Sequence, residues 1–299
     1  MLKDITLGQY FPGNTPIHRL DPRTKLILTT LYIVGLFLAR SFWGLGLWAV
    51  FLWTVIVVSH VNMRLLLRTL RPLILILGLT GLLNVFFTSG EPLVSFWVIT
   101  ITREGLRWAA ILVLRIVLLV MGTFILTYTT APMALTDGLE YLGGPLRRIR
   151  VPVHEMALIM STALRFIPTL LEETDKIMRA QKARGANFET GSIAKRGRAL
   201  LPIFVPLFIG AFRRADELAI AMESRCYHGG ESRTRMRQLR FQKLDMFAGI
   251  IGAILAAAII LMRMDTLARD ITGGVVAVIL VTAMILMRMK GWIGRGRKK

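Results

Sequence analysis

The sequence predicts an all-α membrane protein with about six transmembrane helices and two or three long helices that face the cytoplasm. Hydrophobic residues make up 54% of the 299 residues and charged residues only 19%, compared with about 25% charged residues in a typical soluble protein. The mean hydropathy of +0.58 would leave more apolar surface than water tolerates on a soluble domain. The apolar residues must therefore face lipid or one another within a bilayer.

The basic excess of the chain indicates its orientation in that bilayer. Lys and Arg number 38 against 18 Asp and Glu, which gives a formal net charge of +20. Nucleic acid would suit such a charge, but the basic residues lie between apolar runs, as in the cytoplasmic loops of membrane proteins, so we expect no nucleic-acid partner. The single cysteine, Cys226, excludes a disulfide framework and any site built from several thiolates.

Six apolar segments approach the length of about 20 residues that a helix needs to cross the hydrocarbon core. The first is short, and it becomes long enough if Arg40 snorkels to the interface and the helix extends to Trp43. The expected spans are Leu26–Ala39, Gly44–Val61, Pro72–Thr88, Gly105–Ala131, Met246–Met262 and Ile271–Met287.

Two polar side chains fall inside these spans. A buried Arg in a membrane helix costs at least about 2.5–3.5 kcal/mol, so we expect Arg115 to make a structural contact between helices rather than to mark a substrate pathway. Asn84 is expected to form a hydrogen bond across helices, worth about 0.6 kcal/mol on average.

The loops predict that both termini lie in the cytoplasm of a multi-pass inner or plasma membrane protein. Basic residues follow the second and fourth spans and fill the C-terminal tail, as short cytoplasmic loops do. The N-terminal residues lack an apolar region with a cleavage site, so we expect no removable signal peptide. The expected division is a four-span bundle in 1–131, a cytoplasmic region in 132–243, and a two-span hairpin with a basic tail in 244–299.

The region between spans four and five predicts two long amphipathic helices. Lys176–Lys243 holds 15 basic and 5 acidic residues. In the first helix, Leu164, Ile167 and Leu171 recur at three- and four-residue steps, which is typical of a helix with one buried face. We expect Gly185 to end this helix. We expect the acidic residues Glu172, Glu173 and Asp175 to cap helix ends or to lie on solvated faces.

The second helix repeats this design, and a shift of 41 residues places Asp175 on Asp216. Pro168 and Pro206 are expected to kink the two helices, because proline removes a backbone donor and clashes with the preceding turn. We expect the Gly229-Gly230 pair to end the second helix.

Short segments at three places match the motifs of one family. Gly8–Gly13 (GQYFPG) and Pro16–Lys25 (PIHRLDPRTK) lie near the N-terminus, and Ala183-Arg184-Gly185 ends the first long helix. Ser224-Arg225-Cys226 is its counterpart at the 41-residue shift. These segments resemble the transmembrane T component of energy-coupling factor (ECF) transporters, the EcfT or CbiQ family, which has two Ala-Arg-Gly signatures. In the second segment, Ser224-Arg225-Cys226, only the Arg matches the Ala-Arg-Gly signature. We interpret Cys226 as a tolerated variation, although Gly accepts a positive φ more readily than Cys.

The resemblance implies a scaffold subunit. In that family the T component uses long coupling helices to hold two cytoplasmic ATP-binding-cassette ATPases, and it also holds a membrane S component that captures a vitamin or metal ion. The resemblance implies that Arg184 and Arg225 each dock into one ATPase, beside their neighbours Ala183, Gly185, Ser224 and Cys226. It also implies that the apolar first halves of the helices contact the S component. ATP hydrolysis is then expected to move Lys176–Gly185 and Asp216–Cys226.

Other functions fit the sequence less well. An ATPase would carry the phosphate-binding motif GxxxxGK[ST], and the closest stretch, Gly191–Arg198, lacks its Gly-Lys pair. An intramembrane enzyme needs a motif such as HExxH, and His154-Glu155 has no second His within a turn. A self-contained secondary transporter would show related halves and ionisable residues at the midplane. A basic amphipathic protein acting at anionic lipid surfaces stays the alternative. We expect no enzyme activity, cofactor or metal site in this chain.

Overall fold

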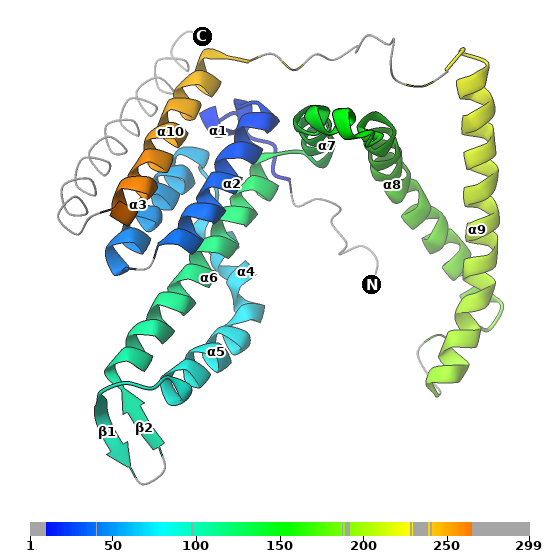
Figure 1. Cartoon of the computed structure of the whole chain (residues 1–299). Helices are drawn as coiled ribbons and strands as arrows, with labels where there is room; N and C mark the ends of the chain where they lie inside the picture. Colours follow the sequence, from blue (N-terminus) through cyan, green and yellow to red (C-terminus); the bar gives the residue numbers. More distant parts are fainter. Residues whose placement is uncertain are drawn as a thin grey trace, which may run out of the picture. The chain divides into compact units, whose positions relative to one another are not determined.

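The computed structural model describes residues 10–39, 41–96, 99–186, 188, 192–227, 229, 239 and 241–264 (Figure 1). The chain divides into two compact units. The bundle unit comprises Gly8–Gly138 and Leu239–Lys299, and the long-helix unit comprises Leu139–Gln238 with Met1–Leu7. The expected sixth span, Ile271–Met287, and Arg40 lie outside the described residues.

Helices of the bundle unit begin at capping residues that the sequence supplies. The Asp21 carboxylate accepts a hydrogen bond from the Arg23 N–H and caps α2 (Pro22–Leu38). Ser41, Asn62 and Thr102 cap their helices in the same way, since each side-chain oxygen accepts from a free N–H of the first turn. The helices of this unit are α1 (Pro16–Arg19), α2, α3 (Phe42–Ser59), α4 (Met63–Leu70), η2 (Arg71–Leu73), α5 (Ile74–Phe87), α6 (Arg103–Thr129) and α10 (Lys243–Met264), and α7 (Pro132–Leu142) crosses into the other unit.

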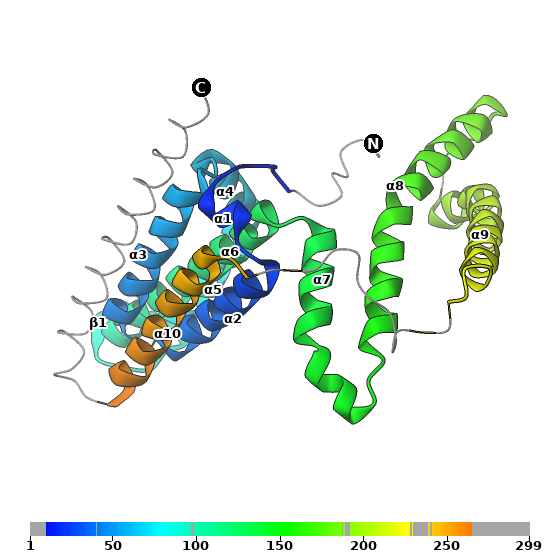
Figure 2. The same ribbon diagram turned by 90° about the horizontal axis from the view of Figure 1, so that it is seen from above.

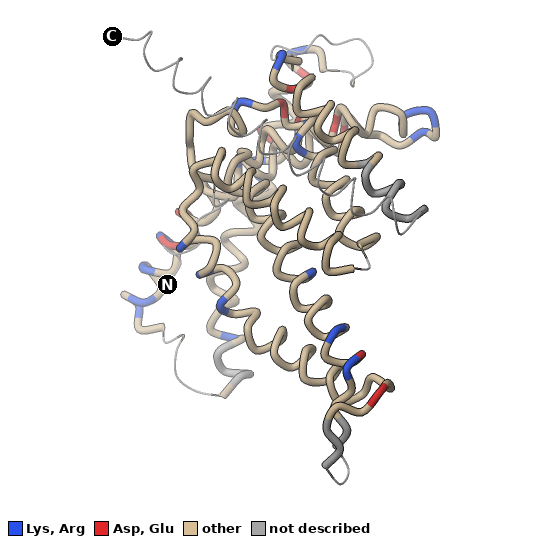
Figure 3. Tube along the Cα trace, turned by 90° about the vertical axis from the view of Figure 1, so that its left-hand side faces the viewer, with Lys and Arg blue, Asp and Glu red and all other residues tan. Residues whose placement is uncertain are grey.

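Among the described residues, three helical stretches are long and apolar enough to cross a membrane: Phe42–Ser59, Met63–Phe87 and Arg103–Thr129. They cover the second, third and fourth expected spans. The third begins at Met63 rather than at Pro72, because α4, η2 and α5 follow one another without a break. The positions of the first and fifth expected spans hold α2, with 17 residues, and α10, with 22 residues. Figure 3 shows long helical stretches without Lys, Arg, Asp or Glu. The membrane-type, helical architecture is thus confirmed, and the count of six spans stays a prediction.

One β-hairpin is an exception to the predicted all-helical architecture. Strands β1 (Pro92–Phe96) and β2 (Ile99–Thr102) pair antiparallel, with Val94 opposite Ile101 and Phe96 opposite Ile99. The hairpin connects the end of α5 to the start of α6, and these two helices lie side by side (Figure 1). The β-branched run Ile-Thr-Ile-Thr favours this extended conformation.

An aromatic cluster forms the centre of the bundle unit. The rings of Tyr32 and Trp48 meet edge to face with centroids 5.3 Å apart, and the Tyr32 hydroxyl donates to the Leu118 carbonyl at 2.8 Å. Two glycines allow this packing, because a Cβ at Gly35 would overlap the Trp48 ring and a Cβ at Gly122 would overlap the Tyr32 ring. The core therefore depends on close approach between α2, α3 and α6.

The two polar residues inside the expected spans behave differently from each other. The Arg115 guanidinium donates from Nη2 to the Ala39 carbonyl at 2.7 Å, so α6 holds the end of α2, and the predicted structural contact is confirmed. Asn84 donates from Nδ2 to the Thr80 carbonyl of its own helix at 3.0 Å. The predicted bond across helices is therefore wrong for Asn84: the i−4 carbonyl of the same turn satisfies the side chain first.

The long-helix unit contains two helices of 31 residues each, α8 (Val153–Ala183) and α9 (Ile193–Glu223), after a short 3₁₀ helix, η3 (Gly144–Ile149). Helix α8 continues through Pro168 and α9 continues through Pro202 and Pro206. The two helices cross rather than lie together along their whole lengths (Figures 1 and 2). Helix α9 ends at Glu223, so the prediction that Gly229-Gly230 ends it is wrong. The helix ends earlier because Cys226, three residues after Glu223, adopts the left-handed conformation.

Candidate functional site

The first predicted signature forms the C-terminal cap of α8. Gly185 has φ +89°, its N–H donates to the Lys182 carbonyl at 3.0 Å, and the Ala186 N–H donates to the Gln181 carbonyl at 3.0 Å. This pair of bonds is a Schellman motif, which satisfies the last carbonyls of a helix by turning the chain through a left-handed residue. Arg184 therefore sits at the last position before the turn, as the sequence predicts for a helix that Gly185 ends.

The second signature forms the same cap on α9, although it lacks the glycine. Cys226 has φ +56°, its N–H donates to the Glu223 carbonyl at 2.8 Å, and the Tyr227 N–H donates to the Met222 carbonyl at 3.0 Å. Each donor and acceptor lies 41 residues after its counterpart in α8. Cys226 adopts the left-handed conformation at a cost of about 1–2 kcal/mol relative to Gly. The predicted equivalence of the two helix ends is thus visible in the backbone hydrogen bonds.

All six signature residues are exposed. Within the described part of the chain, the side chains of Arg184 and Arg225 form no hydrogen bond or ion pair. A cation at the C-terminus of a helix is favoured by the free carbonyl groups there. Each helix tip therefore presents a guanidinium without a partner among the described residues, with five donors in a planar fork that suits carboxylates.

An ion pair joins the two helices well before their tips. Arg214 of α9 donates from Nη2 to a carboxylate oxygen of Glu173 in α8, and Gly210 leaves room for this carboxylate. The prediction that Glu173 is capping or lies on a solvated face is wrong, because the crossing of the helices brings Arg214 to it. Arg184 lies 11 residues after Glu173, and Arg225 lies 11 residues after Arg214. At about 1.5 Å per residue, each tip lies about 16 Å beyond the contact along its own helix.

Helix α9 also carries an exposed apolar stripe in its first two thirds. The side chains at these positions are between 48% and 68% exposed, and they recur at three- and four-residue steps, as one face of a helix does. The stripe consists of Leu201, Phe204, Val205, Phe208, Ile209 and Phe212. Apolar side chains clustered in this way mark contact with lipid or with another protein.

Two of the four histidines, His18 and His154, are hydrogen bonded within the described part of the chain. His154 Nδ1 lies 2.9 Å from a carboxylate oxygen of Glu140, and His18 is hydrogen bonded to the Thr15 hydroxyl and the Phe11 carbonyl. No group of three potential metal ligands occurs among the described residues.

A buried polar cluster at the start of α2 has no counterpart in the sequence predictions. Asp21, Arg23 and Lys25 belong to the N-terminal motif, which was predicted only as a family resemblance, and Asp245 was missed. The signal for Asp21 is its place before Pro22, since Asp-Pro is typical of a helix start. Burial lowers the pKa of Lys25, which precedes the first expected span, to about 8, against the opposing charges of Asp245 and Asp21.

Comparison with known proteins identifies similar membrane transporter components. Residues 13–236 match the family described as cobalt transport protein, CbiQ. The chain is 52% identical over 262 residues to the energy-coupling factor transporter transmembrane protein EcfT of Thermosediminibacter oceani, with 88% of this chain and 99% of that protein covered. The proteins of the same name from Ruminiclostridium cellulolyticum and Lactococcus lactis are 47% and 42% identical, over 88% and 87% of this chain and 98% of each relative. The matched residues include both helix tips described above.

Proposed function

Because the chain belongs to the CbiQ family, as a transmembrane component of energy-coupling factor transporters, we propose that it couples two cytoplasmic ATP-binding-cassette ATPases to a substrate-binding S component in the membrane. The ATPases would hydrolyse ATP, and the S component would capture a vitamin or a metal ion. This chain would act as the scaffold between them, without enzyme activity of its own.

The observation that carries the proposal is the pair of matching helix tips. Both α8 and α9 end in a Schellman motif one residue after an exposed Arg, and this Arg has no partner in the part of the chain that the structure describes. Two equivalent cationic tips on one chain suit two copies of an acidic groove. A guanidinium can form bidentate bonds with a carboxylate there, and removal from water strengthens such bonds. The docking residues we assign are Ala183, Arg184, Gly185, Ser224, Arg225 and Cys226.

The exposed stripe of α9 supports a second partner. Its six large apolar side chains lie between the first turn of α9 and the Glu173–Arg214 contact, away from the basic tip. We assign this stripe to the S component, whose membrane helices would bury it. The arrangement gives one helix an apolar segment for a membrane partner and a cationic end for a soluble partner.

The proposed topology follows the charge distribution. Six spans would cross a cell membrane with both termini in the cytoplasm, as a four-span bundle in 1–131 and a two-span hairpin in 244–299, and the cytoplasmic region 132–243 would carry the coupling helices. The positive loops support this orientation. Movement of α8 against α9 about the Glu173–Arg214 contact would transmit ATPase closure, as a two-state change in helix packing.

The experiment is co-purification of the chain with its ATPases and S component, for the native chain and for the Arg184→Glu plus Arg225→Glu double variant. The native chain should retain two ATPases, and the variant should lose them while still retaining the S component, because the stripe of α9 is unchanged. Reversal of both charges replaces attraction with repulsion in a desolvated groove, which costs several kcal/mol per site.

The matched control is Arg179→Glu plus Arg213→Glu, which makes the same charge change on exposed residues of the same two helices. This variant should retain both ATPases. If both double variants bind the ATPases as the native chain does, the assignment of the two tips is wrong. If the native chain purifies alone and binds vesicles of anionic lipid, the alternative of action at a lipid surface replaces the proposal.

A further inference from the structure

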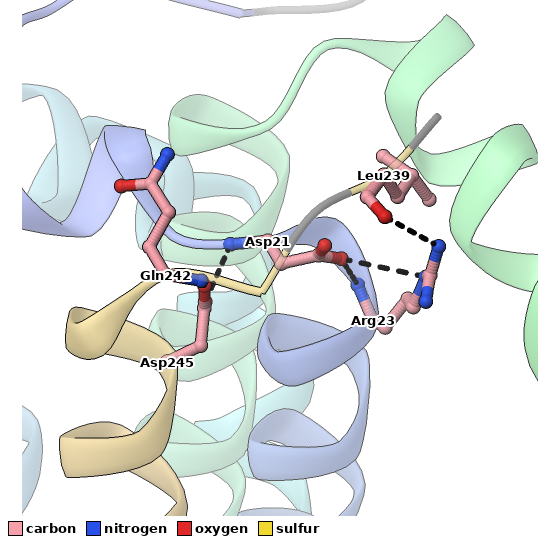
Figure 4. A network of polar contacts seen from close by, with 5 residues as sticks. All are labelled: Asp21, Arg23, Leu239, Gln242 and Asp245. Atoms are coloured by element: carbon pink, nitrogen blue, oxygen red, sulfur yellow. Dashed lines mark hydrogen bonds and ion pairs between the residues drawn. The ribbon is translucent and has the colours of Figure 1, made fainter. Parts of the chain in front are cut away.

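Four charged side chains are buried together at one end of the bundle unit. Asp21, Arg23, Lys25 and Asp245 are each between 3% and 6% exposed. Buried charges are costly unless they are paired or hydrogen bonded, and all four find such partners inside this unit. Figure 4 shows three of the four, Asp21, Arg23 and Asp245. We name these four residues the connector clasp, because of the chain segments that they hold.

Asp245 joins the starts of two helices that are distant in sequence. One carboxylate oxygen accepts from the Asp21 N–H at 2.7 Å, and the other accepts from the Gln242 N–H at 2.7 Å (Figure 4). Both donors precede a helix, so neither has a partner within its own helix. A single carboxylate therefore fixes the beginning of α10 against the beginning of α2.

Arg23 holds the segment that leads into α10. Its Nη2 donates to the Leu239 carbonyl at 3.4 Å, its Nε lies 3.7 Å from an Asp21 carboxylate oxygen, and its guanidinium lies 5.4 Å from the centroid of the Phe241 ring. Leu239 is the residue at which the chain returns to the bundle unit from the long-helix unit. Arg23 thus holds the returning chain at the residue where it re-enters the bundle unit.

Lys25 holds the other connector. Its Nζ donates to the Thr129 carbonyl at 2.9 Å, to the Thr130 hydroxyl at 3.2 Å and to the His18 carbonyl at 3.3 Å. Thr129 ends α6, and the chain passes from there through α7 into the long-helix unit. The first turn of α2 therefore holds Leu239, where the chain re-enters the bundle unit, and also Thr129 and Thr130, from which α7 leads toward the long-helix unit.

We propose that the connector clasp is the positioning element that transmits motion of α8 and α9 to the membrane bundle, an inference that rests on the proposed function. A connector that is free at its root absorbs a displacement of the helix attached to it, whereas a connector fixed by hydrogen bonds to a buried turn passes the displacement on. Apolar residues could fill the same volume at equal or better stability. Buried charges instead specify one register for both roots, because their directional bonds leave no alternative.

The experiment is hydrogen exchange of the assembled complex with its two ATPases, with and without Mg-ATP, for the native chain, Asp245→Asn and Gln242→Ala. In the native complex, ATP should change exchange at the tips, 180–186 and 220–227, and also in peptides covering 20–32 and 239–250. Asn has one acceptor oxygen in place of two, so Asp245→Asn should keep the change at the tips and lose most of the change in the bundle peptides. Gln242→Ala should keep both, because the clasp uses only the backbone N–H of that residue.

Each other outcome rejects the proposal in a distinct way. If Asp245→Asn passes the ATP response to the bundle peptides as the native chain does, or if the native bundle peptides show no response, the clasp does not transmit motion. A milder variant, Arg23→Lys, keeps a cation beside Asp21 but shortens the reach to Leu239. If neither variant assembles with the ATPases, the clasp is needed for folding alone, and the inference is wrong. A native chain without an ATP response at its tips would instead reject the proposed function.

Discussion

Arginine occurs in two opposite settings in this protein. Arg184 and Arg225 are exposed at helix tips and have no partner among the described residues, whereas Arg23 is 5% exposed and contacts Asp21, Leu239 and Phe241. The difference shows how one side chain serves two purposes. At the tips its bonds are free for the partner chain that we propose, and in the clasp its bonds fix the fold of its own chain.

The largest expected effect is a difference in the free energy of unfolding between two variants, in which Arg is replaced by Met in the clasp or at a tip. Arg23→Met leaves the Asp21 carboxylate buried without its cation, and breaking a buried pair costs about 3–5 kcal/mol. Arg184→Met changes an exposed side chain and should alter stability by no more than about 0.5 kcal/mol. Thermal unfolding of the purified chain in detergent measures both. Equal loss in the two variants would show that the contrast between tips and clasp is wrong.

The second effect is a pH dependence that only the clasp should show. Burial lowers the pKa of Lys25 from 10.5 to about 8. Below pH 8 the amine is protonated in both the folded and the unfolded chain, so it contributes no pH dependence. Between about pH 8 and 10.5 the unfolded chain binds more protons, and stability therefore rises with pH, by about 3 kcal/mol in total.

Lys25→Met removes the titrating group and serves as the reference for this measurement. Unfolding is followed at several pH values between 7 and 10.5 for the native chain and the variant. The difference in stability between the two should shift in favour of the native chain as pH rises. A difference that stays constant with pH would mean that Lys25 keeps an ordinary pKa and is better solvated than its burial indicates.

The same contrast explains which features could be predicted from sequence. The apolar runs predict the positions of α2, α3, α6 and α10, because burial in a bilayer requires long unbroken hydrophobic segments. The end of α8 could be predicted because its chemistry is local: consecutive residues supply both the Arg and the Gly that makes the turn. The end of α9 was predicted too late in the chain, because Cys226 makes a left-handed turn for which Gly is usual. The repeat at a 41-residue shift further predicts that the second tip resembles the first, and the hydrogen bonds agree.

The clasp and the crossing of α8 and α9 could not be predicted in this way. Asp21 and Asp245 are 224 residues apart, and Glu173 and Arg214 are 41 apart, so each contact depends on how helices pack rather than on local pattern. From sequence alone, a charged residue beside an apolar run is predicted to lie at a solvated helix end, because its partner is not known. The prediction for Asn84 is wrong for the converse reason, because a carbonyl of its own helix accepts the hydrogen bond that was expected to reach another helix.

The smallest effect concerns the two tips themselves, which differ in one residue of the turn. Cys226→Gly should relieve the left-handed strain, offset in part by the greater freedom of Gly in the unfolded chain, for a net gain of less than about 1 kcal/mol. Gly185→Cys should lose a similar amount at the end of α8. Hydrogen exchange of the last turn of each helix reports these changes, slower in the first variant and faster in the second.

Both variants keep the arginine, so retention of the two ATPases in co-purification should be unchanged. If Cys226→Gly tightens the last turn of α9 but weakens retention of an ATPase, the thiol side chain contacts the partner directly, and the two tips are then not equivalent docking sites. If retention is unchanged, the requirement at each tip is an exposed Arg before a left-handed turn, whatever residue makes that turn. The cost of about 1–2 kcal/mol at Cys226 would then be a difference in local stability alone.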